Sequence, residues 1–217
     1  DVQFSVPDAS LFDTPDWNAY HSRGTPKRIQ DRLAGRSAAK KALANRLNRL
    51  PQTLRIDNDP LGKPFCREFP KVHLSISHAD GLGVAAISDT PVGIDIEQLQ
   101  PRSKAFCAKY FSEHERSLVQ NHPAQINLLW SIKEAVLKLL GLGLRVSARD
   151  IHIDTLGEFH ATISVHGKVA ALFGSHVANF MRIRYRQVHN YCMAMACWAS
   201  HTHTLTSEPS EACRVAA

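Results

Sequence analysis

The pattern of hydrophobic and polar positions predicts one long helix and a pair of strands in the first part of the chain. The stretch Pro26–Leu50 has no internal proline and no strand-like alternation, and it is rich in Ala and Leu. We expect it to form a helix that Pro51 stops. Residues 57–64 combine Asp, Asn, Gly and Pro and predict a loop. Alternation over Val72–Ser77 and an apolar run over Val84–Ile87 predict two paired strands.

The remainder of the chain predicts another strand, further helices and then a series of strands. Residues Val92–Glu97 alternate, and helical patterns follow at about 103–120 and 125–140. The last third alternates apolar with polar or small residues, which is typical of antiparallel strands with one solvent-facing side. These strands are expected at Ile151–Ile153, Phe159–His166, Met181–Arg186 and Tyr191–Ala199, with a short connecting helix at 168–178.

Helices and strands mixed in blocks favour an α+β fold over a doubly wound parallel sheet. The order also suggests a duplication, because a basic helix followed by strands in the first half is matched by a Lys- and Glu-bearing helix followed by strands in the second. Beyond Ser200, a polar segment with Thr, Ser, Glu and Pro is expected to be a disordered tail.

Composition narrows the class of protein. A chain of 217 residues with 44% hydrophobic and 21% charged residues suits one ordinary domain or two small lobes and excludes wholesale disorder. It contains no apolar run close to the length of about 20 residues that a membrane-spanning helix needs. A formal net charge of +6 favours an acidic partner or ligand.

The five cysteines include no C-x-x-C pair. They are therefore interpreted as free thiols in a reducing compartment. The chain opens with Asp1-Val2-Gln3 and shows no charged-then-apolar leader, so we expect a cytoplasmic protein.

Two acidic residues share one face of a predicted strand. Asp95 and Glu97 are two positions apart, so both carboxylates project to the same side, while Ile94 and Ile96 point to the other side. Two neighbouring anions repel unless a cation lies between them. The alternative is a solvated strand face.

The helix expected at 125–140 carries charge where burial is predicted. It is apolar on two sides, with Trp130 and Leu137 on one of them, yet it contains Lys133, Glu134 and Lys138. A surface pair between positions i and i+4 is the simple explanation. A third carboxylate beside the strand pair would instead make an oxygen-rich site suited to Mg²⁺, with lysines left to bind phosphate.

The first predicted helix is strongly basic. Between Lys27 and Arg49 it carries eight basic residues and one acid, Asp31, and Arg36 and Lys40 fall on its apolar face. Long side chains that reach past the core into water would explain this. An anionic ligand held on that face, with arginine binding phosphate, explains it equally well.

Three further positions have ambiguous roles. His78 follows Ser77 at the end of a predicted strand, and Lys63 lies between Gly62 and Pro64. Glu115 completes the pattern Ser-Glu-His-Glu, typical of a capping box. The cap could serve the helix alone or could hold a carboxylate for base catalysis.

In this order the elements resemble a 4'-phosphopantetheinyl transferase of the surfactin-synthetase-activating (Sfp-like) type. The matching segments lie between residues 28 and 138: Leu33-Ala34-Gly35-Arg36, Gly62-Lys63-Pro64, Ser75-Ile76-Ser77-His78, Gly93-Ile94-Asp95-Ile96-Glu97, Phe111 to Glu115, and Trp130-Ser131-Ile132-Lys133-Glu134-Ala135 with Lys138. The Gly-Ile-Asp-Ile-Glu segment followed by Trp-x-x-Lys-Glu-Ala-x-x-Lys is the most specific part.

The resemblance implies two similar α+β halves packed as a pseudo-dimer, each a helix on a small antiparallel sheet, with coenzyme A bound between them. The halves would be residues 1–90, which bind the coenzyme A phosphates, and 91–200, which bind metal and carry out catalysis, followed by the tail 201–217. A monomer is expected if the two halves already supply the pseudo-dimer.

The resemblance also implies a reaction and residue roles. The phosphopantetheine arm of coenzyme A would move to a serine of an apo acyl or peptidyl carrier protein, releasing adenosine 3',5'-bisphosphate. Mg²⁺ would bind Asp95 and Glu134, and Glu97 directly or through a water. Glu115 would accept the serine proton, directly or through a water, and Lys138 would contact the phosphates and steady the leaving group. Lys63 and His78 would bind the pyrophosphate, Arg28, Arg32 and Arg36 would be candidates for the 3'-phosphate, and Ser77 would lie near the adenine.

Two other functions remain open from the residues. Clustered acids with a lysine also suit a Mg²⁺-dependent nuclease, for which the basic balance would favour DNA. However, the basic helix carries no interleaved aromatic residues for stacking, and we expect no nucleic-acid partner. A basic binding module without enzymatic activity is the second alternative. Fatty-acid, polyketide or nonribosomal-peptide carriers all remain possible acceptors.

Overall fold

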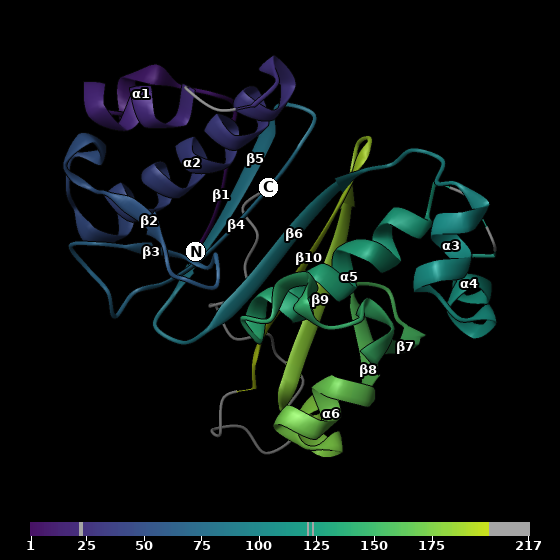
Figure 1. Ribbon diagram of the computed structural model, residues 1–217. Coiled ribbons are helices and arrows are strands. Elements are labelled where there is room, and N and C mark those ends of the chain that lie inside the picture. The colour runs from purple at the N-terminus through teal and green to yellow at the C-terminus, as the bar shows by residue number, and fades with distance from the viewer. Residues whose placement is uncertain (22–23, 121, 123, 200–217) are drawn as a thin grey trace. The chain divides into compact units, whose positions relative to one another are not determined.

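The computed structural model describes residues 1–21, 24–120, 122 and 124–199. They form two compact units, Asp1–Val92 and Gly93–Trp198, whose elements are labelled in Figure 1. The boundary lies two residues from the expected one at 90/91. The tail expected at 201–217 lies outside the described residues.

Unit 1 is one helix on an antiparallel sheet, with a short helix beside it. Its strands are β1 (Val2–Ser5), β2 (Ile56–Asn58), β3 (Pro64–Cys66), β4 (His73–Ala79) and β5 (Leu82–Ser88), and its helices are α1 (Thr14–His21) and α2 (Pro26–Leu47), with 3-10 turns at Ala9–Leu11 and Pro51–Thr53. The sheet order is β1-β5-β4-β3-β2. Helix α2 packs on β1, β4 and β5, as Figure 1 shows.

The long helix α2 is confirmed, and its ends have clear local causes. Thr25 caps its start by accepting a hydrogen bond from the Arg28 backbone N–H, and Pro26 occupies the first turn. The helix ends at Leu47 because Asn48 adopts a left-handed conformation with φ 50°. The end therefore comes three residues before Leu50, the expected limit.

A glycine allows α2 to lie close to the sheet. A Cβ atom on Gly83 of β5 would lie 2.1 Å from the backbone carbonyl of Ala34 in α2. No side chain larger than hydrogen fits there. The packing continues in a core that joins Ala38, Ala39 and Leu43 of α2 to Leu74 and Ile87 of the sheet.

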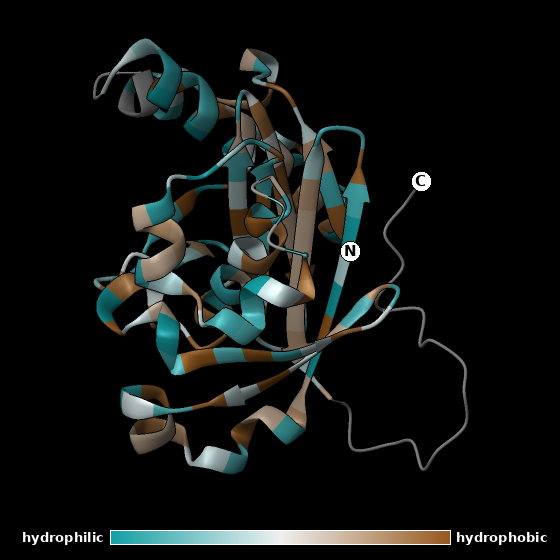
Figure 2. Cartoon of the chain, turned by 90° about the vertical axis from the view of Figure 1, so that its right-hand side faces the viewer, coloured by the Kyte–Doolittle hydropathy of each residue, from teal (hydrophilic) through white to brown (hydrophobic). Residues whose placement is uncertain are grey.

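Unit 2 has the same kind of architecture. Its strands are β6 (Val92–Gln98), β7 (Ile151–Leu156), β8 (His160–Val165), β9 (Met181–Val188) and β10 (Tyr191–Trp198), and its helices are α3 (Lys104–Tyr110), α4 (Glu113–Leu118), α5 (Ile126–Leu139) and α6 (Gly167–Phe173), with 3-10 turns at Gly143–Arg145, Ala148–Asp150 and Ser175–Phe180. Helix α5 packs on β10, β7 and β9. Figure 2 shows strands that are hydrophobic along much of their length beside strands in which hydrophobic and hydrophilic residues alternate.

The two sheets share one topology. Unit 2 is ordered β6-β10-β9-β8-β7, and unit 1 is ordered β1-β5-β4-β3-β2. In each unit the first strand pairs with the last, and the main helix lies between the first and second strands in the sequence. The expected α+β fold with two similar halves is therefore confirmed.

Some local predictions were wrong. The segment 57–64 is not one loop, because Asn58 pairs with Pro64 in a β2–β3 hairpin. The helix expected at 103–120 is two helices, α3 and α4, since the chain is extended at Phe111 and Ser112. The sequence also gave no expectation for β1 or α1.

The remaining expectations concern cysteines and membranes. Within the described part of the chain, Cys66, Cys107 and Cys192 are free thiols as predicted. Among the described helices, none combines the length and the apolar character needed to cross a membrane.

Candidate functional site

The acidic residues singled out in the sequence lie where β6 meets α5. A Cβ atom on Gly93 would lie 1.9 Å from the carbonyl oxygen of Ala135, so this glycine lets the helix pack directly on the strand. Alternation along β6 then turns Asp95 and Glu97 toward the same face as Gly93. On α5, Glu134 and Lys138 are the two partly exposed residues among otherwise buried neighbours.

Lys138 neutralises part of this negative charge. Its Nζ lies 2.6 Å from Oδ1 of Asp95 and donates to the carbonyl oxygen of Ile94 at 3.1 Å. The Asp95 side chain is 5% exposed and that of Lys138 is 25% exposed. The ion pair joins the strand to the helix at the edge of the buried region.

Glu97 is held by a residue that the sequence did not single out. Arg102 Nη2 lies 2.6 Å from Oε2 of Glu97. Its Nε donates to Oδ1 of Asn127, which is buried at the start of α5. Arg102 therefore joins the end of β6 to α5. In the sequence it is one basic residue in a predicted loop, and no pattern there marks it as a partner of Glu97.

The carboxylates remain electrostatically strained despite these cations. Burial, followed by the negative charge of Asp95, raises the pKa of Glu97 to about 7. The same two causes, in the same order, raise the pKa of Glu134 to about 7. Asp95, Glu97 and Glu134 thus form one acidic cluster whose charges oppose one another.

The acidic cluster has the right chemistry for a hard cation, since all its donors are carboxylate oxygens. Within the described residues, however, no three His, Cys, Asp or Glu side chains are grouped as a metal site. The Lys138 ammonium and the Arg102 guanidinium occupy one oxygen each of Asp95 and Glu97. An ion would have to take over these contacts.

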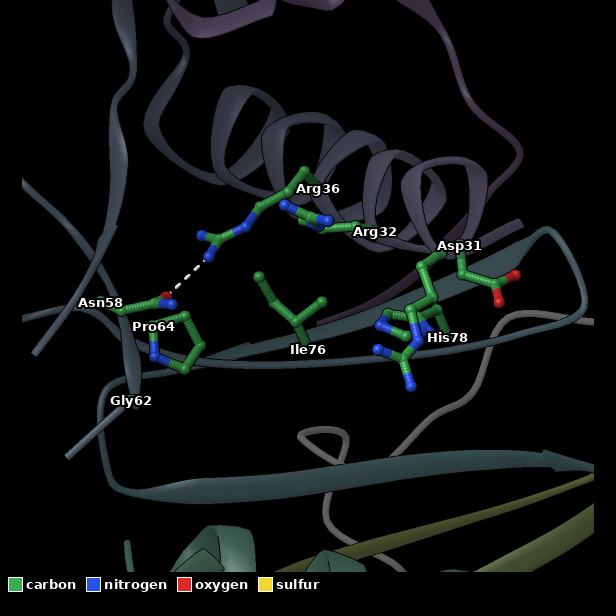
Figure 3. A pocket seen from close by; sticks show the side chains of 9 residues that line it. Asp31, Arg32, Arg36, Asn58, Gly62, Pro64, Ile76 and His78 are labelled. Carbon is green, nitrogen blue, oxygen red and sulfur yellow. Dashed lines mark hydrogen bonds between the residues drawn. The ribbon is translucent and has the colours of Figure 1, made fainter. Parts of the chain in front are cut away.

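Unit 1 contains a separate basic cavity of about 450 Å³. Four of its lining residues are predicted phosphate-binding residues: Arg28, Arg32 and Arg36 of α2, and His78 of β4. Figure 3 shows Arg32, Arg36 and His78 around this space, with Asp31 beside them. Three arginines around one cavity favour a ligand with several negative charges.

Arg36 is anchored to the wall of this cavity. It is 9% exposed, its Nη2 donates to Oδ1 of Asn58 at 2.6 Å, and its Nη1 donates to the carbonyl oxygen of Ile56 at 3.2 Å. Figure 3 shows the Asn58 contact as a dashed line. These bonds hold the guanidinium in place between α2 and β2.

Lys63 and Ser77 do not line the cavity. Lys63 lies between two lining residues, Gly62 and Pro64, and its backbone N–H donates to Oδ1 of Asp59 at 2.8 Å. Ser77 is 8% exposed and lies on β4 between the lining residues Ile76 and His78. Both are therefore next to the cavity in sequence without facing it.

Lys40, on the same helix, has a structural role. It is fully buried, pairs with Oδ2 of Asp16 at 2.7 Å, and donates to the carbonyl oxygens of Pro51 and Leu54. Lys40 therefore fits neither expectation for this helix, which were a side chain that reaches past the core into water and a side chain that binds an anionic ligand. Its partner Asp16 lies 24 positions earlier in the sequence, so helical periodicity could not predict this contact.

Glu115 forms the capping box predicted from Ser112. It is 1% exposed, and its Oε2 accepts from the Ser112 backbone N–H at 2.8 Å. Its Oε1 pairs with Nζ of Lys133 at 2.8 Å and accepts from the Ile153 backbone N–H at 3.0 Å. Both carboxylate oxygens are therefore engaged, and the predicted role as a base would require them to be released.

Lys133, like Lys40, is a fully buried lysine. Its Nζ also donates to the carbonyl oxygen of Tyr110 at 2.9 Å. Burial lowers the pKa of Lys133, and the charge of Glu115 opposes that shift. The interaction joins α3, α4 and α5, so the motif lysine supports the helix that carries Glu134 and Lys138.

Comparison with known proteins gives one family. Residues 91–196 match the family model described as the 4'-phosphopantetheinyl transferase superfamily. A 4'-phosphopantetheinyl transferase of Bacillus pumilus is 33% identical over 156 residues, 68% of this chain and 64% of the relative. A 4'-phosphopantetheinyl transferase of Bacillus subtilis is 30% identical over 151 residues, 67% of this chain and 66% of the relative.

A third relative matches a shorter segment. The 4'-phosphopantetheinyl transferase Sfp of Bacillus subtilis strain 168 is 34% identical over 96 residues, 42% of this chain and 43% of the relative. The chain thus matches just under two thirds of the length of the first two relatives and less of Sfp.

We predict that the acidic cluster makes the protein less stable as pH rises. The folded pKa values of Glu97 and Glu134 lie near 7, above the ordinary 4.5. Between pH 4.5 and about pH 7 the folded state therefore holds more protons than the unfolded state. The free energy of unfolding falls as the pH rises through this range. In urea titrations with EDTA, Glu97→Gln/Glu134→Gln should be more stable than the wild type at pH 8, with a smaller difference at pH 5. A difference that does not change with pH would contradict the prediction.

We also predict that Glu115→Gln destabilises the fold by about 3–5 kcal/mol, because it leaves the buried Lys133 ammonium without its counter-charge. Denaturant unfolding at pH 7 measures this loss. Glu113→Gln, in the exposed first turn of the same helix, is the matched control and should stay within about 0.5 kcal/mol. Adding Lys133→Met to Glu115→Gln should recover much of the loss. Unchanged stability of Glu115→Gln would show that the pair contributes nothing.

Proposed function

We propose that this chain, whose residues 91–196 match the 4'-phosphopantetheinyl transferase superfamily, transfers the phosphopantetheine arm of coenzyme A to a carrier protein. The acceptor is a serine hydroxyl of an apo acyl or peptidyl carrier protein, and adenosine 3',5'-bisphosphate is the second product. Three curated transferases similar to the chain support this activity. The observation that carries it is the buried acidic cluster with Lys138 at its edge.

We assign phosphate binding in unit 1 to the basic cavity. Arg28 and Arg32 would bind the 3'-phosphate together with Arg36, whose guanidinium is already oriented by Asn58. Planar guanidinium groups bind phosphate oxygens in pairs, so three of them suit a doubly charged phosphate. His78 would bind the pyrophosphate from the same cavity wall.

Lys63 and Ser77 have a weaker structural basis in this proposal. Lys63 would have to turn its side chain toward the pyrophosphate from the loop between β2 and β3. Ser77 would act beside the adenine through a short movement of β4, because its side chain is nearly buried.

In unit 2, Asp95, Glu97 and Glu134 would hold Mg²⁺. The fit rests on the oxygen-only donor set and on the raised pKa values of Glu97 and Glu134, since a nearby cation relieves both. When bound, Mg²⁺ would polarise the pyrophosphate and neutralise its developing charge. Lys138 would then release Asp95 and bind the phosphate of the leaving group.

The carrier serine must also lose its proton. Glu115 was the candidate base, but its carboxylate is buried against Lys133 and two backbone N–H groups. We therefore propose that Glu115 acts mainly as a positioning residue, through Lys133 and helix α5. Its role as a base is retained only if Glu115→Gln slows transfer at a temperature where the variant remains folded.

The alternative functions have less support. The matched family and the curated relatives are transferases, and no comparison favours a nuclease. A binding module without activity would have no use for the cluster of carboxylates and Lys138. A monomer in the cytoplasm and the absence of nucleic-acid and membrane partners remain predictions.

The proposed activity predicts a mass change. An apo carrier protein incubated with coenzyme A, Mg²⁺ and this protein should gain about 340 Da, the mass of one phosphopantetheine arm, in a Mg²⁺-assisted transfer measured by intact mass spectrometry. Glu134→Gln should abolish the gain while its circular dichroism spectrum stays unchanged. The matched control is Glu113→Gln, which removes an exposed carboxylate outside the cluster and should retain activity.

Two results would contradict the proposal. If neither acyl nor peptidyl carriers gain mass with the wild-type protein, the proposed transferase activity is wrong. If Glu134→Gln is fully active, the proposed transferase activity stands but the proposed metal site is wrong.

A further inference from the structure

Arg102 is held from three sides in the loop between β6 and α3. Its Nη2 lies 2.6 Å from Oε2 of Glu97, and its Nε donates to Oδ1 of Asn127 in α5. Its guanidinium carbon lies over the Phe106 ring of α3, 5.1 Å from the ring centre, which is close enough for a cation–π attraction. The Phe106 ring in turn packs edge-on against Trp130 of α5. The position of the guanidinium therefore depends on α3 and α5 as well as on Glu97.

Asn127, the polar anchor of Arg102, is itself fixed. It is fully buried, and its Nδ2 donates to the carbonyl oxygens of Gln100 and Ala124. Because these two bonds use both hydrogens of the side-chain amide, they also fix the direction in which Oδ1 accepts from Arg102. We therefore expect the guanidinium to stay in place even when its ion pair with Glu97 is weakened.

The cation on Asp95 is easier to displace than the cation on Glu97. Lys138 donates to Oδ1 of Asp95 and to the carbonyl oxygen of Ile94, two acceptors on the same strand. A lysine ammonium is a compact charge on a flexible stem, whereas a guanidinium is a rigid fork whose donors point in fixed directions. An ion bound directly by all three carboxylates would have to displace both cations. The anchors of Arg102 favour displacement of the lysine alone.

We infer that Arg102 is a positioning residue that prevents Glu97 from binding the metal ion directly. This inference rests on the metal site of the proposed function. Asp95 and Glu134 are then the direct protein ligands, and Glu97, held through Oε2, accepts a hydrogen bond at Oε1 from a water on the ion. Mg²⁺ in proteins is usually bound by one or two carboxylates and keeps several of its waters. The anchored guanidinium therefore maintains the coordination that suits Mg²⁺.

Removal of the guanidinium changes both the charge around the ion and the number of its ligands. Arg102→Met keeps an unbranched, apolar side chain beside the Phe106 ring and removes the positive charge. Glu97 can then turn toward the ion and become a third carboxylate ligand. The ion also loses the repulsion of a nearby cation. Both changes strengthen the binding of a divalent cation to the site.

The test measures metal binding without coenzyme A and uses Mn²⁺ as the probe. Mn²⁺ accepts the same oxygen ligands as Mg²⁺, and unbound Mn²⁺ is measured by electron paramagnetic resonance, with Mg²⁺ as competitor. Dissociation constants at pH 8 are compared for the wild type, Arg102→Met, Glu97→Gln and the double variant. The matched control is Arg67→Met, which removes the same charge from an ion pair of the same length, 2.6 Å, with Asp57 in unit 1.

Arg102→Met should bind Mn²⁺ at least about tenfold more tightly than the wild type, and the control should stay within about twofold. The loss of affinity caused by Glu97→Gln should be at least about tenfold greater in Arg102→Met than in the wild type, because Glu97 has become a direct ligand there. A purely structural role of Arg102 would not change the effect of Glu97→Gln. If Arg102→Met does not fold, Arg102→Gln replaces it, with changes in the same direction.

Two results would overturn the inference and leave the proposed metal site intact. The first is unchanged or weaker Mn²⁺ binding by Arg102→Met, since weaker binding means that Arg102 orients Glu97 for direct ligation. The second is an equal effect of Glu97→Gln in both backgrounds. If the wild type binds neither ion, or binds them no better than Glu134→Gln does, the metal site is wrong and the inference is wrong with it. The transferase activity is judged separately, by the mass gain of the carrier.

Discussion

The functional region depends on the mutual repulsion of three carboxylates brought together at one edge of a buried helix. Asp95 and Glu97 come from a strand, and Glu134 comes from α5. Lys138 and Arg102 relieve part of this repulsion and simultaneously join the strand to the helix. What remains raises the pKa values of Glu97 and Glu134 to about 7. Such a cluster lowers stability by itself and gains most from a cation, which is the property a phosphoryl-transfer site needs.

The scaffold explains why this charge can be held so close to the core. Gly93 brings α5 against β6, as Gly83 brings α2 against β5. In each unit a buried lysine then fixes the surroundings of the main helix: Lys40 with Asp16 in unit 1, and Lys133 with Glu115 in unit 2. The repeated topology therefore supports two different sites, a basic cavity in unit 1 and an acidic cluster in unit 2.

The sequence predicted those parts that depend on short-range periodicity. Alternation placed Asp95 and Glu97 on one face, and helical spacing placed Glu134 beside Lys138, so the acidic cluster was anticipated. Contacts that depend on the path of a loop or on helix packing were not: Arg102 turns back to Glu97 from the loop five positions later, and Asp16 reaches Lys40 from another helix. The β2–β3 hairpin was missed because its Gly and Pro residues predict only a turn. Glu115 was correctly expected to form a capping box, but its pairing with Lys133 depends on the packing of α4 against α5.

The most direct test of the central claim is the effect of Mg²⁺ on thermal stability. Melting temperatures are measured with EDTA and with millimolar MgCl₂, at pH 5 and pH 8, for the wild type and Glu134→Gln. A ligand that binds only the folded state raises the melting temperature, and here it competes with protons on Glu97 and Glu134. The account predicts a rise in the wild type that is larger at pH 8 than at pH 5 and is absent in Glu134→Gln. No rise at pH 8, or the same rise in the variant, would contradict it.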